Sequence, residues 1–228
     1  MSNETRIDYY LEIAQKYPHV FDNSSNCLEI VLDREVLIRE QENLYQNAKK
    51  KGHPLHWYDI GVVSEDSWTI VLRDLVKTIS GTYTGYIRML NRKSQLERNG
   101  KDVVILVQVE GTYLILKHFR HDDRLYHWEC PRGFGESNLT AEENARKEIM
   151  EETGLTVSSL EQLNTSHEPI AYFLAKCCGD YNCNDVGEGI ETMRYISERE
   201  FASMIADGSI NDQFSIKAYT LAKIRNMI

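Results

Sequence analysis

The sequence predicts an α/β domain that follows an N-terminal extension of helices and strands. Two helical patterns precede residue 55, segments rich in Val, Ile, Tyr and Thr run from residue 57 to residue 90, and beyond residue 100 short strands flank a carboxylate-rich helix. Apolar periods of about 3.6 residues for helices and about 2 for strands distinguish the two kinds of element. We therefore expect an α+β extension at residues 1–95 and an α/β domain at residues 102–228, joined by a polar linker at 91–100.

The chain has an ordinary globular composition, with 42% hydrophobic and 27% charged residues among 228, and it is long enough to bury a core. Its net charge of −9 leaves no basic surplus to neutralise phosphates, which argues against a nucleic-acid partner. Neither a signal-like apolar region near the start nor a stretch of about 18 apolar residues is present. We expect a cytoplasmic protein without a membrane partner.

The extension contains two helices with recognisable ends. The first, at residues 4–17, stops at Pro18, and the second, at 33–51, begins at the capping residue Asp33 and ends before Gly52. Three strand-like segments follow, separated by polar turns, at residues 57–63, 68–77 and 82–90. They predict a three-stranded antiparallel meander.

The second domain alternates strands with helices. Two strands surround a Glu110–Gly111 turn, and a third, shorter strand leads into a loop rich in Pro and Gly. The expected strands are 103–109, 113–119, 126–130, 160–166, 170–177 and 191–196, and the expected helices are 140–153, 197–206 and 212–224.

The helix at 140–153 carries the residue pattern most suggestive of chemistry. Thr140 is a favourable N-cap, Glu143 completes a capping box, and Gly154 supplies the left-handed stop.

Three carboxylates, those of Glu148, Glu151 and Glu152, fall on one face of this helix, because their spacing is i, i+3 and i+4. Like charges at this spacing repel by about 0.2–0.5 kcal/mol per pair, and a hard divalent cation removes that cost. Mg²⁺ prefers oxygen ligands, takes one or two protein carboxylates and leaves other positions to water and phosphates, and Mn²⁺ accepts similar ligands. The alternative is a solvated acidic surface.

The loop before the helix favours a binding function. Gly133 and Gly135 allow the backbone to approach a ligand closely, and Glu136 adds a fourth acid near the helix.

The segment ECPRGFGESNLTAEENARKEIMEETGL, residues 129–155, resembles the sequence signature of the Nudix hydrolases. Its second half, Lys147 to Leu155, matches that signature at every position except Lys for Arg. In the first half, strict spacing places the opening glycine on Gly133 and puts Leu139 where the signature has Glu. Glu136 is the substitute if the loop is longer here than in the family.

The resemblance implies a Nudix fold, which is a mixed sheet sandwiched between helices. It also implies a metal site formed by Glu148, Glu152, Glu151 and Glu136, holding Mg²⁺ or Mn²⁺. Lys147 would orient one of the carboxylates through a salt bridge, although lysine lacks the bidentate fork of arginine.

A second resemblance concerns the ADP-ribose pyrophosphatase branch of the family. HFRH followed by WECPRG is similar to QYR and WELPAG of that branch, so that Arg120 and Glu129 match its Arg and Glu. By this resemblance Arg120 would contact a substrate phosphate or a dimer partner, Glu129 and Gly133 would line the substrate site, and the extension would take part in a homodimer.

The same branch places a catalytic Glu in a loop ahead of a late strand. Glu188 is the best match, with Glu191 and Asp185 as competitors, and it would act as the general base toward the attacking water. A solvated loop acid is the alternative interpretation.

These resemblances imply metal-dependent hydrolysis of a pyrophosphate bond in a nucleoside diphosphate linked to another group. ADP-ribose is the first choice, with AMP and ribose 5-phosphate as products. Two alternatives stay open: a weakly catalytic or non-catalytic sensor of nucleotide sugars, and a housecleaning pyrophosphatase acting on other nucleotides.

Overall fold

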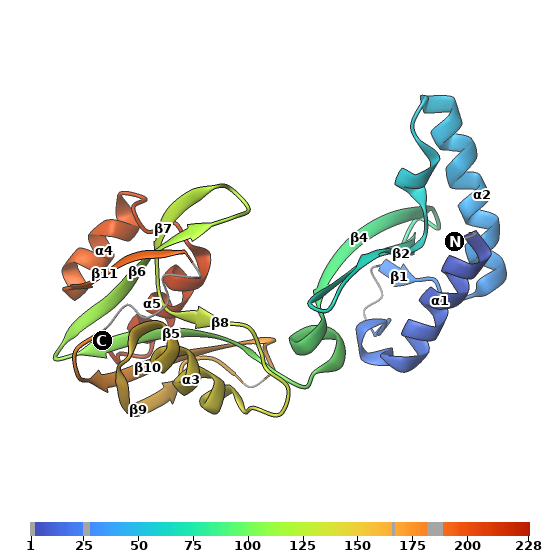
Figure 1. Cartoon of the computed structure of the whole chain (residues 1–228). Helices are drawn as coiled ribbons and strands as arrows, with labels where there is room; N and C mark the ends of the chain where they lie inside the picture. Colours follow the sequence, from blue (N-terminus) through green and yellow to red (C-terminus); the bar gives the residue numbers. More distant parts are fainter. Residues whose placement is uncertain (1–2, 25–27, 166, 182–188) are drawn as a thin grey trace. The chain divides into compact units, whose positions relative to one another are not determined.

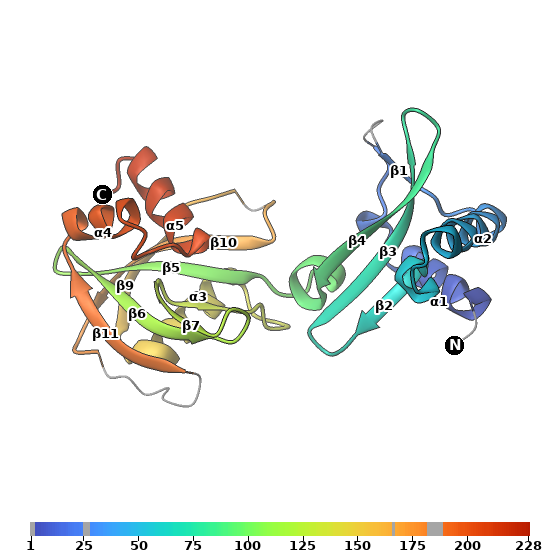
Figure 2. The ribbon, with the colours of Figure 1, turned by 90° about the horizontal axis from the view of Figure 1, so that it is seen from above.

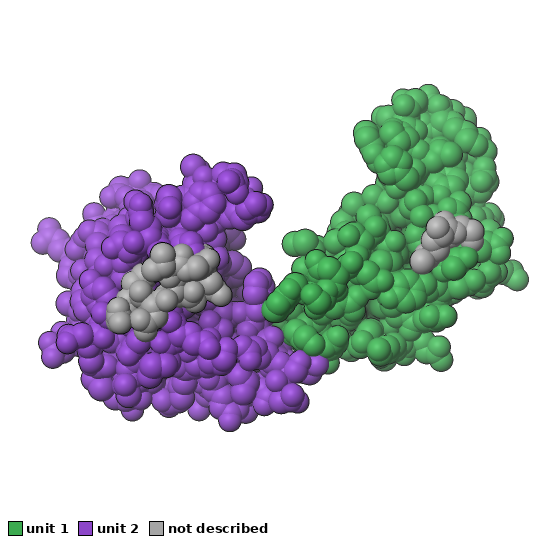
Figure 3. All heavy atoms as spheres, viewed as in Figure 1, with its two compact units in different colours: residues 1–98 green, residues 99–228 purple. Residues whose placement is uncertain are grey.

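A computed structural model describes residues 3–24, 28–165, 167–181 and 189–228. The chain divides into two units, Met1–Arg98 and Asn99–Ile228 (Figure 3). Each unit has its own hydrophobic core, and the two are described separately.

The first unit is built around β3 (Thr69–Thr78), which pairs antiparallel with every other strand of a four-stranded sheet. Those strands are β1 (Leu28–Ile30), β2 (Gly61–Glu65) and β4 (Tyr83–Asn91). Two helices, α1 (Asn3–Lys16) and α2 (Arg34–Lys51), lie along one side of this sheet (Figures 1 and 2). Their apolar residues form one core with Ile70, Leu72 and Leu75 of β3.

The expected three-stranded antiparallel meander is present as β2-β3-β4. Three features of this unit differ from the expectations, the first being β1, which was not foreseen and adds a fourth strand to the sheet. The segment expected as a strand from residue 57 begins as a short 3-10 helix, Leu55–Tyr58, which follows Pro54. The stretch expected as a linker contains a π-helix, Arg92–Glu97, because Asn91 caps it and Leu96 buries its side chain in the core.

The second unit contains a seven-stranded mixed sheet in the order β11-β6-β5-β10-β9, with β7 beside β6 and β8 beside β5. Only β5 and β10 pair in parallel, and all other pairs are antiparallel. The strands are β5 (Asp102–Val109), β6 (Thr112–Arg120), β7 (Leu125–Glu129), β8 (Arg132–Gly133), β9 (Thr156–Gln162), β10 (Ile170–Cys178) and β11 (Ile190–Ile196). The strand expected at 160–166 starts earlier, directly after the Gly154 helix stop.

Helices cover both faces of this sheet (Figure 2). Because side chains alternate along β5, Val103 and Ile105 pack with α3 (Ala141–Thr153), whereas Val104 and Leu106 pack with α4 (Glu198–Ala206) and α5 (Gln213–Ile224). The prediction of a mixed sheet sandwiched between helices is confirmed. Among the described residues, no helix is both long and apolar enough to cross a membrane.

Candidate active site

Helix α3 has the ends that its sequence predicts. The Thr140 side chain accepts from the Glu143 backbone N–H and the Glu143 side chain accepts from that of Thr140, which completes the capping box. Gly154 ends the helix at φ 71°. Since Ala145 and Ile149 are buried in the core of the sheet, the rotation of the helix is fixed and the position of each carboxylate follows.

The loop that precedes α3 lies directly against this helix. A Cβ atom on Gly133 would come within 2.0 Å of the Glu148 carboxylate, so only glycine leaves room for that side chain. The backbone N–H of Gly135 donates to Asp102 at 2.8 Å, and the amide of Asn144 donates to the Phe134 carbonyl at 3.0 Å. These contacts hold the loop and the helix carboxylate in one arrangement.

Glu152 is the most unusual carboxylate of the helix. It is only 4% exposed, and its Oε2 atom has no hydrogen-bond partner among the described residues. Burial raises the pKa of Glu152 well above its ordinary value, and the negative charges of Glu148 and Glu129 raise it further. A buried carboxylate oxygen without a partner costs free energy, and a cation satisfies it.

Lys147 forms ion pairs with two other acids, Glu136 and Glu151, which lie outside this buried position. Its ammonium donates to Glu136 at 2.6 Å and to Glu151 at 2.8 Å, and both carboxylates are about half exposed. These two hydrogen bonds raise the pKa of Lys147. The acids predicted as metal ligands therefore form two groups: Glu148 with Glu152 facing inward, and Glu136 with Glu151 around Lys147.

The residues fit a cation held by Glu148 and Glu152. Mg²⁺ usually takes one or two protein carboxylates and completes its shell with water and substrate. Across the described ranges, no three His, Cys, Asp or Glu side chains form a ready-made metal cluster. The unpartnered oxygen of Glu152 fits the two-carboxylate arrangement.

Glu129, at the end of β7, is the centre of a buried ionic network. It is 1% exposed and accepts two hydrogen bonds from the Arg120 guanidinium, one of them from Nε at 3.1 Å. Arg132 Nη2 lies 3.4 Å from Glu129 Oε2, and His118 Nδ1 lies 3.1 Å from Oε1. Burial alone would raise the pKa of Glu129, but the His118 hydrogen bond and the charges of Arg132 and Arg120 lower it. Glu129 thus stays ionised and fixes two arginines.

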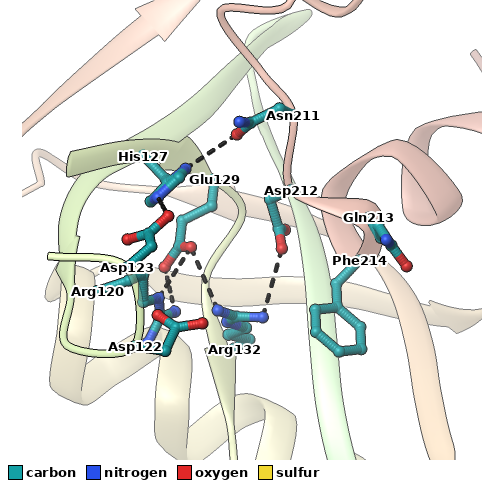
Figure 4. Close-up of a pocket in the computed structure, with 10 residues that line it drawn as sticks. All are labelled: Arg120, Asp122, Asp123, His127, Glu129, Arg132, Asn211, Asp212, Gln213 and Phe214. Atoms are coloured by element: carbon teal, nitrogen blue, oxygen red, sulfur yellow. Dashed lines mark hydrogen bonds and ion pairs between the residues drawn. The ribbon is translucent and has the colours of Figure 1, made fainter. Parts of the chain in front are cut away.

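These arginines lie in a pocket of about 360 Å³ (Figure 4). Arg132 extends between Glu129 and Asp212, its Nη1 lying 3.4 Å from Asp212 Oδ1, and its guanidinium carbon is 4.8 Å from the centre of the Phe214 ring. His127 also lines the pocket. Its Nδ1 atom lies 2.9 Å from Asn211 Oδ1, and its Nε2 atom lies 2.7 Å from Asp123 Oδ2. The lining residues are Arg120, Asp122, Asp123, His127, Glu129, Arg132, Asn211, Asp212, Gln213 and Phe214.

The pocket and the buried helix carboxylates are neighbours. The charges of Glu129 and Arg120 both act on Glu152, and the backbone N–H of Arg132 stabilises its charged form. The arrangement therefore combines two neighbouring helix carboxylates, one of which has an oxygen without a hydrogen-bond partner among the described residues, with two arginines that can receive a negatively charged group.

The family comparison agrees with this geometry. The model of the NUDIX domain matches residues 98–209, which contain all the strands and helices that form the carboxylate site. The chain contains a Nudix domain. As a Nudix protein with the helix carboxylates of the family signature in place, it is a pyrophosphohydrolase. No curated protein matches its sequence significantly.

A solved structure described as that of an ADP compounds hydrolase resembles the Nudix chain in fold. The TM-score is 0.58 at 16% sequence identity, over 71% of this chain and 88% of the other. The matched 71% of this chain contains more residues than the second unit, so the match also includes part of the first unit.

Several predicted site residues meet in the Nudix unit, and others do not. Gly133, Glu148, Glu152, Glu129 and Arg120 converge, whereas Lys147, Glu136 and Glu151 form the group beside them. The proposed base Glu188 and its competitor Asp185 lie outside the described residues. The other competitor, Glu191, pairs with Lys117 at 2.5 Å.

The sequence reasoning missed Arg132, Asp212 and Phe214. Arg132 could have been found, because it directly precedes Gly133 in the signature loop and is the cation nearest the glycine in sequence. Asp212 was recognised only as a helix start, which it is, since it caps α5 while also contacting Arg132.

Proposed function

We propose that this Nudix protein hydrolyses a pyrophosphate bond in a nucleoside diphosphate linked to another group, with ADP-ribose as first choice and AMP and ribose 5-phosphate as products. The single observation that carries the proposal is the buried Glu152 oxygen without a partner, beside a second carboxylate that Gly133 accommodates. We propose Mg²⁺, or Mn²⁺, as the cation that these residues hold.

Glu148 and Glu152 would bind the cation from the inner face of α3. When bound, a divalent cation neutralises diphosphate charge and lowers the pKa of a water molecule. Lys147 would keep Glu136 and Glu151 in place at the rim of the site through its two short ion pairs, and either acid would be available as a further metal ligand.

Arg120 and Arg132 would receive the phosphates. Both are anchored on the ionised Glu129, so their guanidinium groups are oriented before substrate arrives and little side-chain freedom is lost on binding. Glu188 would accept the proton of the attacking water, as the resemblance to the ADP-ribose pyrophosphatase branch implies. The reaction asks mainly for positioning and charge stabilisation, which these residues supply.

ADP-ribose is favoured over other nucleotides by two findings. Arg120 and Glu129 match the branch motif and contact each other, and the structural neighbour is described as an ADP compounds hydrolase. We also propose a homodimer formed through the first unit, where Val63, Trp68 and Met89 are apolar and exposed.

A substrate panel tests the proposal. Purified protein with Mg²⁺ is incubated with ADP-ribose, other nucleoside diphosphate sugars, NADH, dinucleoside polyphosphates and nucleoside triphosphates, and the products are separated by chromatography. Turnover of ADP-ribose to AMP that is lost in Glu148→Gln and Glu152→Gln supports it, with Glu142→Gln on the exposed first turn of α3 as the matched control. Turnover of none of the compounds contradicts it.

A further inference from the structure

The first unit contains a pocket that the hydrolytic site does not use. It lies between the 3-10 helix Leu55–Tyr58, the end of α2 and strands β3 and β4, and its volume is about 370 Å³. Small-molecule sites commonly enclose about 300–1,000 Å³. Its lining residues are Leu44, His53, Trp57, Tyr58, Arg73, Thr84, Gly85 and Ile87, all within one unit.

Aromatic side chains form one wall of this pocket. The rings of His53 and Tyr58 are stacked at 6.1 Å and 18°, and His53 Nδ1 lies 2.7 Å from the Tyr58 hydroxyl, which locks both rings. Trp57 lies 5.7 Å from His53 and is 56% exposed. An indole held against a rigid ring pair while half its surface faces solvent offers a platform on which a planar group can stack.

Arg73 supplies a positive charge in the same pocket. Its Nη1 donates to the Asp59 carbonyl at 3.0 Å, and in the described part of the chain no carboxylate lies within ion-pair distance of it. The nearby Asp59 carboxylate is already engaged by Arg6 at 2.5 Å and by the Tyr45 hydroxyl. Burial lowers the pKa of Arg73, which reflects the cost of a half-buried cation without an anionic partner.

Gly85 shapes the floor of the pocket. Its backbone does not adopt a positive φ, so the backbone conformation does not require glycine. A Cβ atom there would lie 3.2 Å from Arg73 Cδ. The missing side chain leaves the space in which the Arg73 side chain crosses the sheet.

We propose that this pocket is a second ligand site, for a small molecule that combines a planar aromatic base with a phosphate, which is the chemistry of a nucleoside monophosphate. The base stacks on Trp57, and the phosphate pairs with the Arg73 guanidinium, which suits phosphate oxygens. Two positively charged side chains, those of Arg73 and Arg6, lie near the single carboxylate of Asp59. The local charge is therefore positive, although the net charge of the chain is −9. The site is independent of the proposed hydrolysis.

Titration of the full-length protein with AMP in the presence of EDTA tests this proposal. Binding is followed by calorimetry and by tryptophan fluorescence, and we expect a dissociation constant below about 1 mM. Arg73→Gln should weaken binding about tenfold or more and Trp57→Ala about fivefold or more, because a charge-assisted hydrogen bond and a stacked base are worth at least about those factors. Lys77→Gln, which removes an exposed charge from the same strand outside the pocket, should leave binding unchanged.

Further ligands and variants separate the possible results. Adenosine and inorganic phosphate, each carrying half of the recognised chemistry, should bind more weakly than AMP. AMP binding that Arg73→Gln leaves intact and Glu152→Gln removes would assign the ligand to the hydrolytic site and overturn the proposal. Absence of AMP binding, with Trp57→Ala shifting the sedimentation coefficient toward a smaller species, would identify the pocket as an interface between copies and also overturn it. Trp57 is half exposed, so its truncation leaves the fold intact.

Discussion

Replacing Glu152 by Gln should stabilise the metal-free protein and remove its response to Mg²⁺. The Glu152 carboxylate is buried, one of its oxygens has no hydrogen-bond partner among the described residues, and the charges of Glu148 and Glu129 oppose its ionisation. An amide has nearly the same shape, carries no charge and can donate a hydrogen bond to a neighbouring carboxylate. The substitution therefore removes an unfavourable interaction without creating a cavity.

The size of this effect follows from the unsatisfied atom. Leaving a buried polar group unsatisfied costs about 1–3 kcal/mol, so the free energy of unfolding should rise by about that amount. For a chain of this length, each kcal/mol raises the melting temperature by about 2–4 °C, which corresponds to a gain of roughly 2–12 °C. If the wild type binds Mg²⁺ at this site, the ion at 100 times its dissociation constant should add about 2.7 kcal/mol of stability.

Thermal denaturation followed by circular dichroism, in EDTA and in Mg²⁺, measures both effects. Glu142→Gln is the matched control on the same helix, because Glu142 is exposed on the first turn and lies outside the proposed metal site. A melting temperature of Glu152→Gln in EDTA equal to or below that of the wild type would refute the reasoning. So would a stabilisation by Mg²⁺ that persists in the variant.

Three further predictions concern the surrounding residues. Gly133→Ala should lower kcat/KM by about 100-fold with the fold retained, because its Cβ displaces the Glu148 carboxylate; unchanged kinetics would contradict this. Arg120→Ala should reduce the free energy of unfolding by about 3 kcal/mol in urea titrations, since it removes one partner of the buried Glu129; an unchanged midpoint would refute it. His127 should titrate above its ordinary pKa of 6.5 by NMR, because its amide and carboxylate partners stabilise the cation, and this contribution to stability should vanish as pH rises through that raised pKa; a value at or below 6.5 would be inconsistent.

Much of the fold was accessible from the sequence because local signals agreed with tertiary packing. Helix α3 begins and ends where Thr140 and Gly154 indicate. The strand expected at 103–109 is β5, whose continuous apolar run is buried on both faces of the sheet. The six strands expected in the second domain occur in the expected order, as β5, β6, β7, β9, β10 and β11, with the two-residue β8 added.

The remaining elements depend on contacts between residues distant in sequence. β1 has three residues and forms only because β3, more than 40 residues later, presents an open edge at Val76 to Thr78. The π-helix at Arg92–Glu97 follows from the burial of Leu96 in a core that its own polar neighbours do not suggest.

The candidate site also depends on contacts between distant residues, which the sequence alone does not reveal. Helical spacing places Glu148, Glu151 and Glu152 on one face but cannot separate the buried carboxylate from the exposed one. That separation comes from the loop, in which Gly133 makes room for Glu148 and Glu136 attracts Lys147 from 11 positions away. The contact between Arg132 and Asp212 joins residues 80 positions apart.

We propose that Glu148 and Glu152 hold the cation on which hydrolysis depends. The most direct test of this claim is Mn²⁺ binding by electron paramagnetic resonance, measured beside ADP-ribose hydrolysis, in the wild type, Glu148→Gln, Glu152→Gln and the control Glu142→Gln. We predict that binding and hydrolysis are lost together in the first two variants and retained in the control. Hydrolysis that survives in EDTA, or Mn²⁺ binding that survives both substitutions, would contradict the claim.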